Sequence, residues 1–265
     1  MRAFEYHRPS STKEALALGK KDEARYLAGG QSLVQAMKLR LSSPSDLIDL
    51  SSLKDLVGIK AAGSTVEIGA MTRHADVAGS KEVQKAIPAL AALAGIIGDR
   101  QVRHMGTIGG SLANSDPAAD YPAAVLGLGA TIATSKRKIE ADKYFKGLFE
   151  TALEPGELIA AVSFPVPKRA AYMKFKNPAS RFALVGVFVA DFGGGSVRVA
   201  VTGAGPCAFR QAEMEKALAA KFAPESVANI KVKADGLNND LHASPEYRAH
   251  LITVMAKRAV EAALK

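Results

Sequence analysis

The sequence predicts an α+β protein, and three observations predict it. Stretches of helical period and short strand-like runs are mixed along the chain, without the strict alternation of a doubly wound fold. Pairs of expected strands are separated by glycine turns, at Gly63 and at residues 193–195. A proline-rich segment, 165–167, separates two regions of different pattern and is interpreted as a linker.

Local signals place the elements before this linker. Ser11 followed by Glu14 is a capping box, which predicts a helix start. Residues 32–41 have a helical period that places Leu41 on the apolar face. Pro88 predicts the first turn of a second helix within an alanine-rich helical stretch. The expected helices are 13–19, 32–41, 80–98 and 122–128, and the expected strands are 24–27, 46–50, 57–60, 66–68 and 158–164.

A different pattern follows the linker. Residues 182–192 and 196–202 flank three glycines and predict a β-hairpin, since Val197, Val199 and Val201 alternate with other residues. Two helices are expected afterwards, at 210–220 and 246–264.

The composition is that of an ordinary globular protein, with 48% hydrophobic and 23% charged residues. No apolar run reaches the ~18 residues that span a bilayer, and the N-terminal residues lack a secretory signal, so we expect a cytoplasmic protein. The 35 basic and 26 acidic residues give a net charge of +9, but the basic residues are spread along the chain. No nucleic-acid-binding motif accompanies them. We interpret them as a solvated basic surface that is available to an acidic partner subunit.

The metal-binding residue types are too few or too scattered for a metal site. Cys207 is the only cysteine, so the chain can form no internal disulfide and cannot hold an iron–sulfur cluster, which needs about four such ligands. The five histidines include no pair at metal-ligand spacing.

The first candidate binding segment, 28–33, lies between an expected strand and an expected helix. Gly29 and Gly30 can adopt positive φ, which lets backbone N–H groups point into one concavity. The helix that begins at Ser32 adds unpaired N–H groups and the positive end of its dipole. A diphosphate fits this geometry. A plain strand-to-helix turn is the alternative interpretation, and a Gly-Gly pair alone would favour it.

The second candidate segment, 106–114, has three glycines within five residues, flanked by Thr107 and Ser111, and predicts a second backbone nest for an anion. Asp120 follows and can accept hydrogen bonds from sugar or ribityl hydroxyls. Its alternative role is to cap the next helix, and both roles are compatible. Asp116 and Asp120 as a catalytic carboxylate pair is a weaker interpretation than structural use.

Several other chemistries lack their motifs. The sequence contains no G-x-G-x-x-G with a downstream acidic residue, and no P-loop motif. The segment around Ser32 lacks the second glycine of a nucleophile elbow.

Taken together, a series of motifs resembles the FAD-binding medium subunit of the xanthine dehydrogenase and carbon monoxide dehydrogenase family. The resemblance covers essentially the whole chain, and the combination of motifs is highly specific although each motif alone is not. The motifs occur at residues 28–33, 37–41, 46–50, 68–72, 106–110, 116–120 and 154–159, and beyond the linker at 172–174, 203–206, 210 and 244–248.

The resemblance implies a two-lobed FAD-binding domain of the vanillyl-alcohol-oxidase type over residues 1–165, with lobes at about 1–56 and 57–165. A smaller C-terminal domain of sheet and helices is implied over 168–265. The implied FAD-binding residues are Ala28, Gly29, Gly30, Gln31, Ser32, Leu33, Thr107, Ile108, Gly109, Gly110 and Ser111 around the diphosphate, Asp120 at the polyol, Leu158 and Ile159 packing on the cofactor, and Lys174 contacting it. The basic stretch 100–105 is open to three interpretations, a partner contact, a phosphate contact or a solvated loop, and only Met105 is added to the site.

Two residues depart from the family pattern. Tyr121 stands where the family usually has leucine, and Arg181 stands where an acidic residue is common. Beside the flavin, Tyr121 would change the stacking and Arg181 would alter the charge near the isoalloxazine, so both residues bear on the flavin potential and on the choice of acceptor.

The implied function is electron transfer within a molybdenum hydroxylase. A large molybdenum-cofactor subunit and a small subunit with two [2Fe-2S] clusters would be partners, in a dimer of heterotrimers, and FAD would serve an external electron acceptor. No catalytic residue is expected in this chain. Two alternatives remain: a self-sufficient flavoprotein oxidase of the same fold, for which ~100 residues after the linker are few, and a basic nucleic-acid-binding protein.

Overall fold

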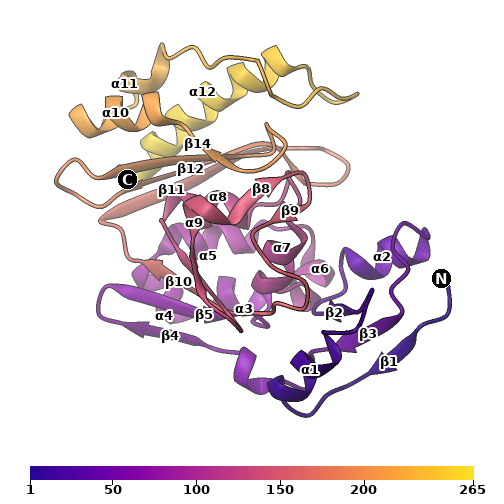
Figure 1. Cartoon of the computed structure of the whole chain (residues 1–265). Helices are drawn as coiled ribbons and strands as arrows, with labels where there is room; N and C mark the ends of the chain where they lie inside the picture. The colour runs from indigo at the N-terminus through magenta and orange to yellow at the C-terminus, as the bar shows by residue number, and fades with distance from the viewer.

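The computed structural model describes residues 1–265. Figure 1 shows a first lobe at the lower right, a second lobe of sheet and helices beside it, and a C-terminal sheet that helices cover from above. Parallel and antiparallel sheets are mixed with helices, which confirms the α+β class. No helix is both long and apolar enough to cross a membrane.

The first lobe is a three-stranded parallel sheet with strand order β1-β3-β2. Its short helix α1 begins where the capping signal predicts, with the Ser11 hydroxyl accepting a hydrogen bond from the N–H of Glu14. Its small core of seven buried residues includes Leu158, which directly precedes strand β10 of the second lobe in the sequence. The elements are β1 (Glu5–His7), α1 (Thr12–Leu18), β2 (Arg25–Leu27), α2 (Leu33–Lys38), β3 (Asp46–Asp49) and the 3₁₀ helix η1 (Lys54–Leu56).

The second lobe is a five-stranded antiparallel sheet with order β4-β5-β10-β6-β7, packed against helices. Pro88 occupies the first turn of α5, as predicted. The strands are β4 (Ile59–Ala62), β5 (Thr65–Gly69), β6 (Thr131–Thr134), β7 (Lys138–Glu140) and β10 (Ile159–Pro165), with a small hairpin of β8 (Phe145–Gly147) and β9 (Glu150–Thr151). The helices are α3 (His74–Gly79), α4 (Lys81–Ala86), α5 (Pro88–Gly95), α6 (Arg100–Met105), α7 (Ile108–Asn114), α8 (Tyr121–Gly127) and α9 (Ala141–Tyr144).

The C-terminal sheet, order β11-β12-β13-β14, is antiparallel and covered on both faces. Every residue of β12 is buried, because Val187 and its alternate neighbours face the C-terminal helices while Phe188 and Ala190 join the core of the second lobe. The predicted hairpin at the three glycines is confirmed as β12–β13. The elements are β11 (Arg169–Lys176), β12 (Ala183–Asp191), β13 (Val197–Thr202), β14 (Phe209–Arg210), α10 (Ala212–Ala220), α11 (Glu225–Ala228) and α12 (Pro245–Ala263).

Several elements of the structure differ from the sequence predictions. Helix α2 ends at Lys38, because Arg40 adopts a φ of +61°, and Leu41 is 79% exposed, not on a buried face. The stretch 100–105, for which a solvated loop was one interpretation, is a helix whose first turn is capped by Asp99. Strand β11 was not predicted, and neither were strands β6 and β7 of the second lobe.

Candidate functional site

The two lobes meet at glycines. A Cβ atom at Gly29 would lie 2.2 Å from the carbonyl oxygen of Met105 and 2.6 Å from the Cα of Gly106. A Cβ atom at Gly156, whose φ is +69°, would lie 2.7 Å from the carbonyl oxygen of Gly19. Only glycine permits such backbone contact. The structure therefore brings the first candidate segment directly against the start of the second.

The first segment has the unpaired amides that a phosphate site needs. Gly30 adopts a φ of +71°, and the backbone N–H groups of the five residues from Gly29 to Leu33 donate to no group of the protein. The side chain of Gln31 donates from Nε2 to the carbonyl oxygen of Gly29 at 3.1 Å, and the Ser32 hydroxyl makes no capping bond. Consecutive unpaired N–H groups beside a positive-φ glycine form an anion-binding concavity.

The second segment is not a nest of free amides. The N–H of Gly110 donates to the Thr107 hydroxyl at 3.1 Å, so Thr107 caps helix α7. The N–H groups of Ile108, Gly109 and Ser111 donate to the carbonyl oxygens of Thr72, Ala70 and Thr107. What this segment can offer a ligand is the N–H of Thr107 and the hydroxyl groups of Thr107 and Ser111. A Cβ at Gly110 would lie 3.3 Å from that of Ala28, so the two segments also meet here.

Asp120 and Lys174 form a buried ion pair. The Lys174 ammonium lies 2.9 Å from one carboxylate oxygen, and the Tyr172 hydroxyl donates to the same oxygen at 2.6 Å. Lys174 also donates to the carbonyl oxygen of Ile96 at 3.3 Å. Burial raises the pKa of Asp120, and the Lys174 ammonium and the Tyr172 hydroxyl oppose that rise. Asp120 makes no side-chain bond to helix α8, so it does not cap that helix.

The remaining predicted residues lie in different surroundings. Leu158 is buried in the core of the first lobe, against which Ala28 also packs, whereas Ile159 belongs to the core of the second lobe. Met105 ends helix α6 and is 51% exposed. Asp120 is hydrogen-bonded to Tyr172 and Lys174 of β11, and Lys174 is also bonded to Ile96 at the end of α5. No hydrogen bond links Asp120 or Lys174 to the glycine segments.

Sequence reasoning missed two residues, His74 beside the second segment and Tyr172 beside Asp120. A Cβ at Gly106 would lie 2.5 Å from Nε2 of His74, so the imidazole lies directly beneath the second segment. Burial, helped by Arg103, lowers the pKa of His74 to about 4. Nδ1 of His74 and the hydroxyl of Tyr121 are both buried without partners, and the two rings are 5.4 Å apart. No spacing motif marks His74, because its neighbours come from distant parts of the chain.

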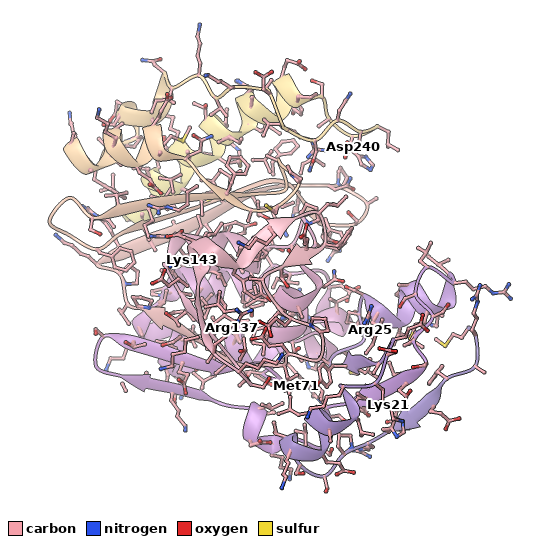
Figure 2. The ribbon with its side chains drawn as sticks, in the orientation of Figure 1. Lys21, Arg25, Met71, Arg137, Lys143 and Asp240 are labelled. Carbon is pink, nitrogen blue, oxygen red and sulfur yellow. The ribbon has the colours of Figure 1, made fainter.

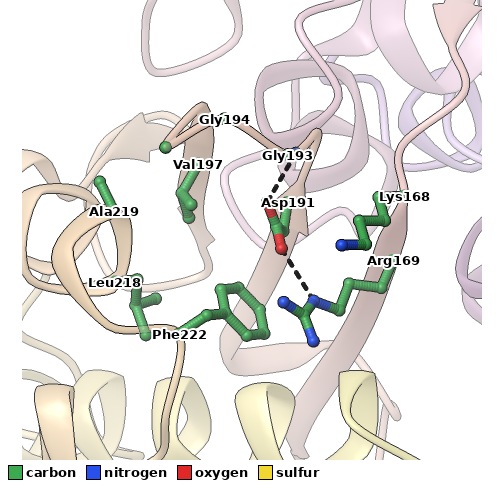
Figure 3. A pocket seen from close by; sticks show the side chains of 10 residues that line it. Lys168, Arg169, Asp191, Gly193, Gly194, Val197, Leu218, Ala219 and Phe222 are labelled. Carbon is green, nitrogen blue, oxygen red and sulfur yellow. Dashed lines mark hydrogen bonds and ion pairs between the residues drawn. The ribbon is translucent and has the colours of Figure 1, made fainter.

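A separate hollow of about 190 Å³ lies at the far end of the C-terminal sheet, and Figure 3 shows its lining. Asp191 accepts hydrogen bonds from Nε of Arg169 and from the N–H of Gly193, both at 2.8 Å, and the guanidinium lies over the ring of Phe222. None of the predicted FAD-binding residues lines this hollow. Its polar groups are used to join β11 to the end of β12.

Comparison with known proteins gives a consistent result. A family model described as "FAD binding domain in molybdopterin dehydrogenase" matches residues 2–167. The carbon monoxide dehydrogenase medium chain of Afipia carboxidovorans is 37% identical, over 98% of this chain and 96% of that relative. The glyceraldehyde dehydrogenase medium chain of Sulfolobus acidocaldarius is 35% identical, over 97% and 96%. A chain in the structure of reconstituted CO dehydrogenase from Oligotropha carboxidovorans superposes with a TM-score of 0.92 at 36% identity, covering 99% of this chain and 98% of that chain.

Proposed function

This chain belongs to the FAD-binding medium subunits of the xanthine dehydrogenase and carbon monoxide dehydrogenase family, and on that premise we propose that it is the electron-transferring flavin subunit of a molybdenum hydroxylase. FAD is its cofactor, it is part of an oxidoreductase, and its fold is the FAD-binding fold predicted from the sequence. Bound FAD supplies the capacity to collect electron pairs from the iron–sulfur clusters of a partner and to pass them to an external acceptor.

The residues of the lobe contact fit the flavin diphosphate. We propose that the five unpaired N–H groups from Gly29 to Leu33 hold its oxygens, because they are the donors that the protein leaves free. Thr107 and Ser111 would add hydroxyl donors from the opposite lobe. The capping bond between Thr107 and Gly110 fixes the position of that second segment.

The ion pair and the apolar residues would position the rest of the cofactor. Asp120 would accept hydrogen bonds from the polyol hydroxyls while Lys174 and Tyr172 hold its carboxylate in place. Met105, Leu158 and Ile159 would pack on the apolar parts. Residues 1–165 would form the FAD-binding domain and 168–265 the C-terminal domain.

The partners follow from the same premise. Two relatives are named medium chains of dehydrogenases, which are parts of multi-subunit enzymes. We propose a large subunit with the molybdenum cofactor and a small subunit with two [2Fe-2S] clusters, in a dimer of heterotrimers. An interface of more than ~1,000 Å² with these partners is expected.

The observation that carries the proposal is the run of unpaired amides at the contact between the lobes. Its test is the cofactor content of the complex purified with its partner subunits. One non-covalent FAD per copy of this chain is expected, with iron and molybdenum in the other subunits. Stoichiometric iron on this chain, or full substrate turnover by a stable monomer, would contradict the proposal.

A further inference from the structure

The β8–β9 hairpin ends in an exposed apolar tip. Gly147 pairs with Glu150, so Leu148 and Phe149 form its two-residue turn. Leu148 is 61% exposed and Phe149 is 58% exposed, and neither packs against any core of the molecule. The folded chain therefore gains little from the apolar character of either side chain.

Phe149 is also held in an unfavourable backbone conformation. Its φ is +54°, in the left-handed region that bulky residues avoid and that turns usually fill with glycine or asparagine. The Phe149 side chain is exposed and its backbone is strained, so this residue does not stabilise the isolated chain. Such features concentrate at binding sites.

Four basic residues and one acidic residue, Glu140, line a hollow at the base of the same hairpin. The hollow has a volume of about 380 Å³, and its lining includes Lys146 of β8 and Ala152, which follows β9. Lys138 and Lys146 have no salt-bridge partner, whereas Lys143 pairs with Glu140 at 2.8 Å. Figure 2 shows Lys143 and Arg137, two further basic residues of this lining, over the second lobe and to the left of the first lobe.

We propose that the hairpin tip, Leu148 and Phe149, inserts into an apolar pocket of another subunit of the same complex, and that carboxylates around that pocket meet Lys138 and Lys146. The tip supplies an aromatic anchor of the kind that dominates binding energy at protein interfaces. The unpaired lysines supply charge complementarity and orient the approach. The inference rests on the proposed function, since it requires that the chain has partner subunits.

Phe149→Gly tests the tip, because it should not lower the stability of the chain but should weaken its binding to the partner. Glycine relieves the positive φ, so the melting temperature of the isolated chain should stay the same or rise. The affinity for the co-expressed partner subunits should fall by at least about tenfold, as the loss of an anchor residue does. Dissociation of the complex on dilution, followed by native mass spectrometry, gives that affinity.

Matched controls show whether relieving a positive φ or removing an exposed apolar side chain elsewhere also weakens assembly. Glu23→Gly relieves a comparable φ of +58° on the first lobe, and Leu241→Ser removes a side chain that is 90% exposed elsewhere. Both should assemble as the unchanged chain does. Lys146→Glu should weaken assembly, and Lys233→Glu, on another exposed lysine, should not.

The outcomes distinguish this inference from the proposed function. If the unchanged chain forms no complex with its partners, the proposed function fails. If it assembles and Phe149→Gly assembles with equal affinity, the proposed function stands and the docking role of the hairpin is overturned. Equal weakening by the Glu23 and Leu241 controls would overturn it as well.

Discussion

The ammonium of Lys174 lies 2.9 Å from the carboxylate of Asp120, and only 2% and 4% of these two side chains are exposed. Lys174 is in β11 and Asp120 precedes helix α8, so the pair joins the C-terminal sheet to the second lobe. A buried charge that loses its partner is strongly destabilising, because it keeps its desolvation cost without the compensating attraction.

Asp120→Ala should therefore destabilise the chain by about 3–5 kcal/mol and reduce its FAD content. Tyr172→Phe, which removes one hydrogen bond to the same carboxylate, should cost about 1.5–3 kcal/mol. Chemical denaturation and flavin absorbance measure both quantities. A loss of only ~1 kcal/mol for Asp120→Ala with unchanged flavin affinity would contradict both the strength of the buried ion pair and the flavin-binding role of Asp120.

Gly29→Ala tests the contact between the lobes. The new Cβ would meet the backbone of Met105 and Gly106, which cannot move aside as a flexible side chain can, so the lobes should be forced apart. We expect a destabilisation of about 1–3 kcal/mol and loss of FAD. Gly79→Ala is the matched control, because nothing lies within 4 Å of its Cβ position and alanine favours the helix. Wild-type FAD content in Gly29→Ala would contradict this view of the contact.

Gly110→Val tests the second segment. A Cβ there would lie 3.0 Å from the Thr107 hydroxyl and 3.3 Å from Ala28, and the valine methyl groups would press further on the first segment. FAD binding should be abolished while the melting temperature changes little, because Gly110 lies outside the buried core. Full FAD occupancy in this variant would mean that the second segment does not contribute to the site.

Local signals in the sequence predicted local structure well. The Ser11 cap, the helix start at Pro88 and the valine alternation of β13 each depend on residues a few positions apart, and each is present. Strand β11 was missed because its sequence does not alternate cleanly, and its extended form depends on eight residue pairs with β12. Pairing between strands is decided by the whole fold.

The site was predicted only in part, for the same reason. Glycine pairs indicated where the backbone of one segment comes close to another, but not which amides stay free. The sequence cannot show that the Thr107 hydroxyl takes up the Gly110 amide, nor that Lys174 reaches Asp120 across 54 residues. Both follow from tertiary contacts.

His74 predicts a specific pH dependence of stability. Its pKa in the folded chain is about 4, below the ordinary value of 6.5, so the unfolded chain binds more protons between these values. The contribution of neutral His74 to the stability of the folded chain is fully present above about pH 6.5 and is lost as the pH falls towards about 4. The free energy of unfolding should fall by up to about 1.4 kcal/mol per pH unit in this window. His74→Gln should flatten that slope, and an unchanged slope in denaturation measured across the window would rule out this role.

The most direct test of the central claim is hydrogen–deuterium exchange on the assembled complex with and without FAD. The amides from Gly29 to Leu33 have no partner in the protein, so they should exchange rapidly without FAD and become protected when it binds. The amides from Ile108 to Ser111 are already hydrogen-bonded and should change much less. Unchanged exchange at residues 29–33, with new protection at another segment, would contradict the assignment of the flavin diphosphate to this loop.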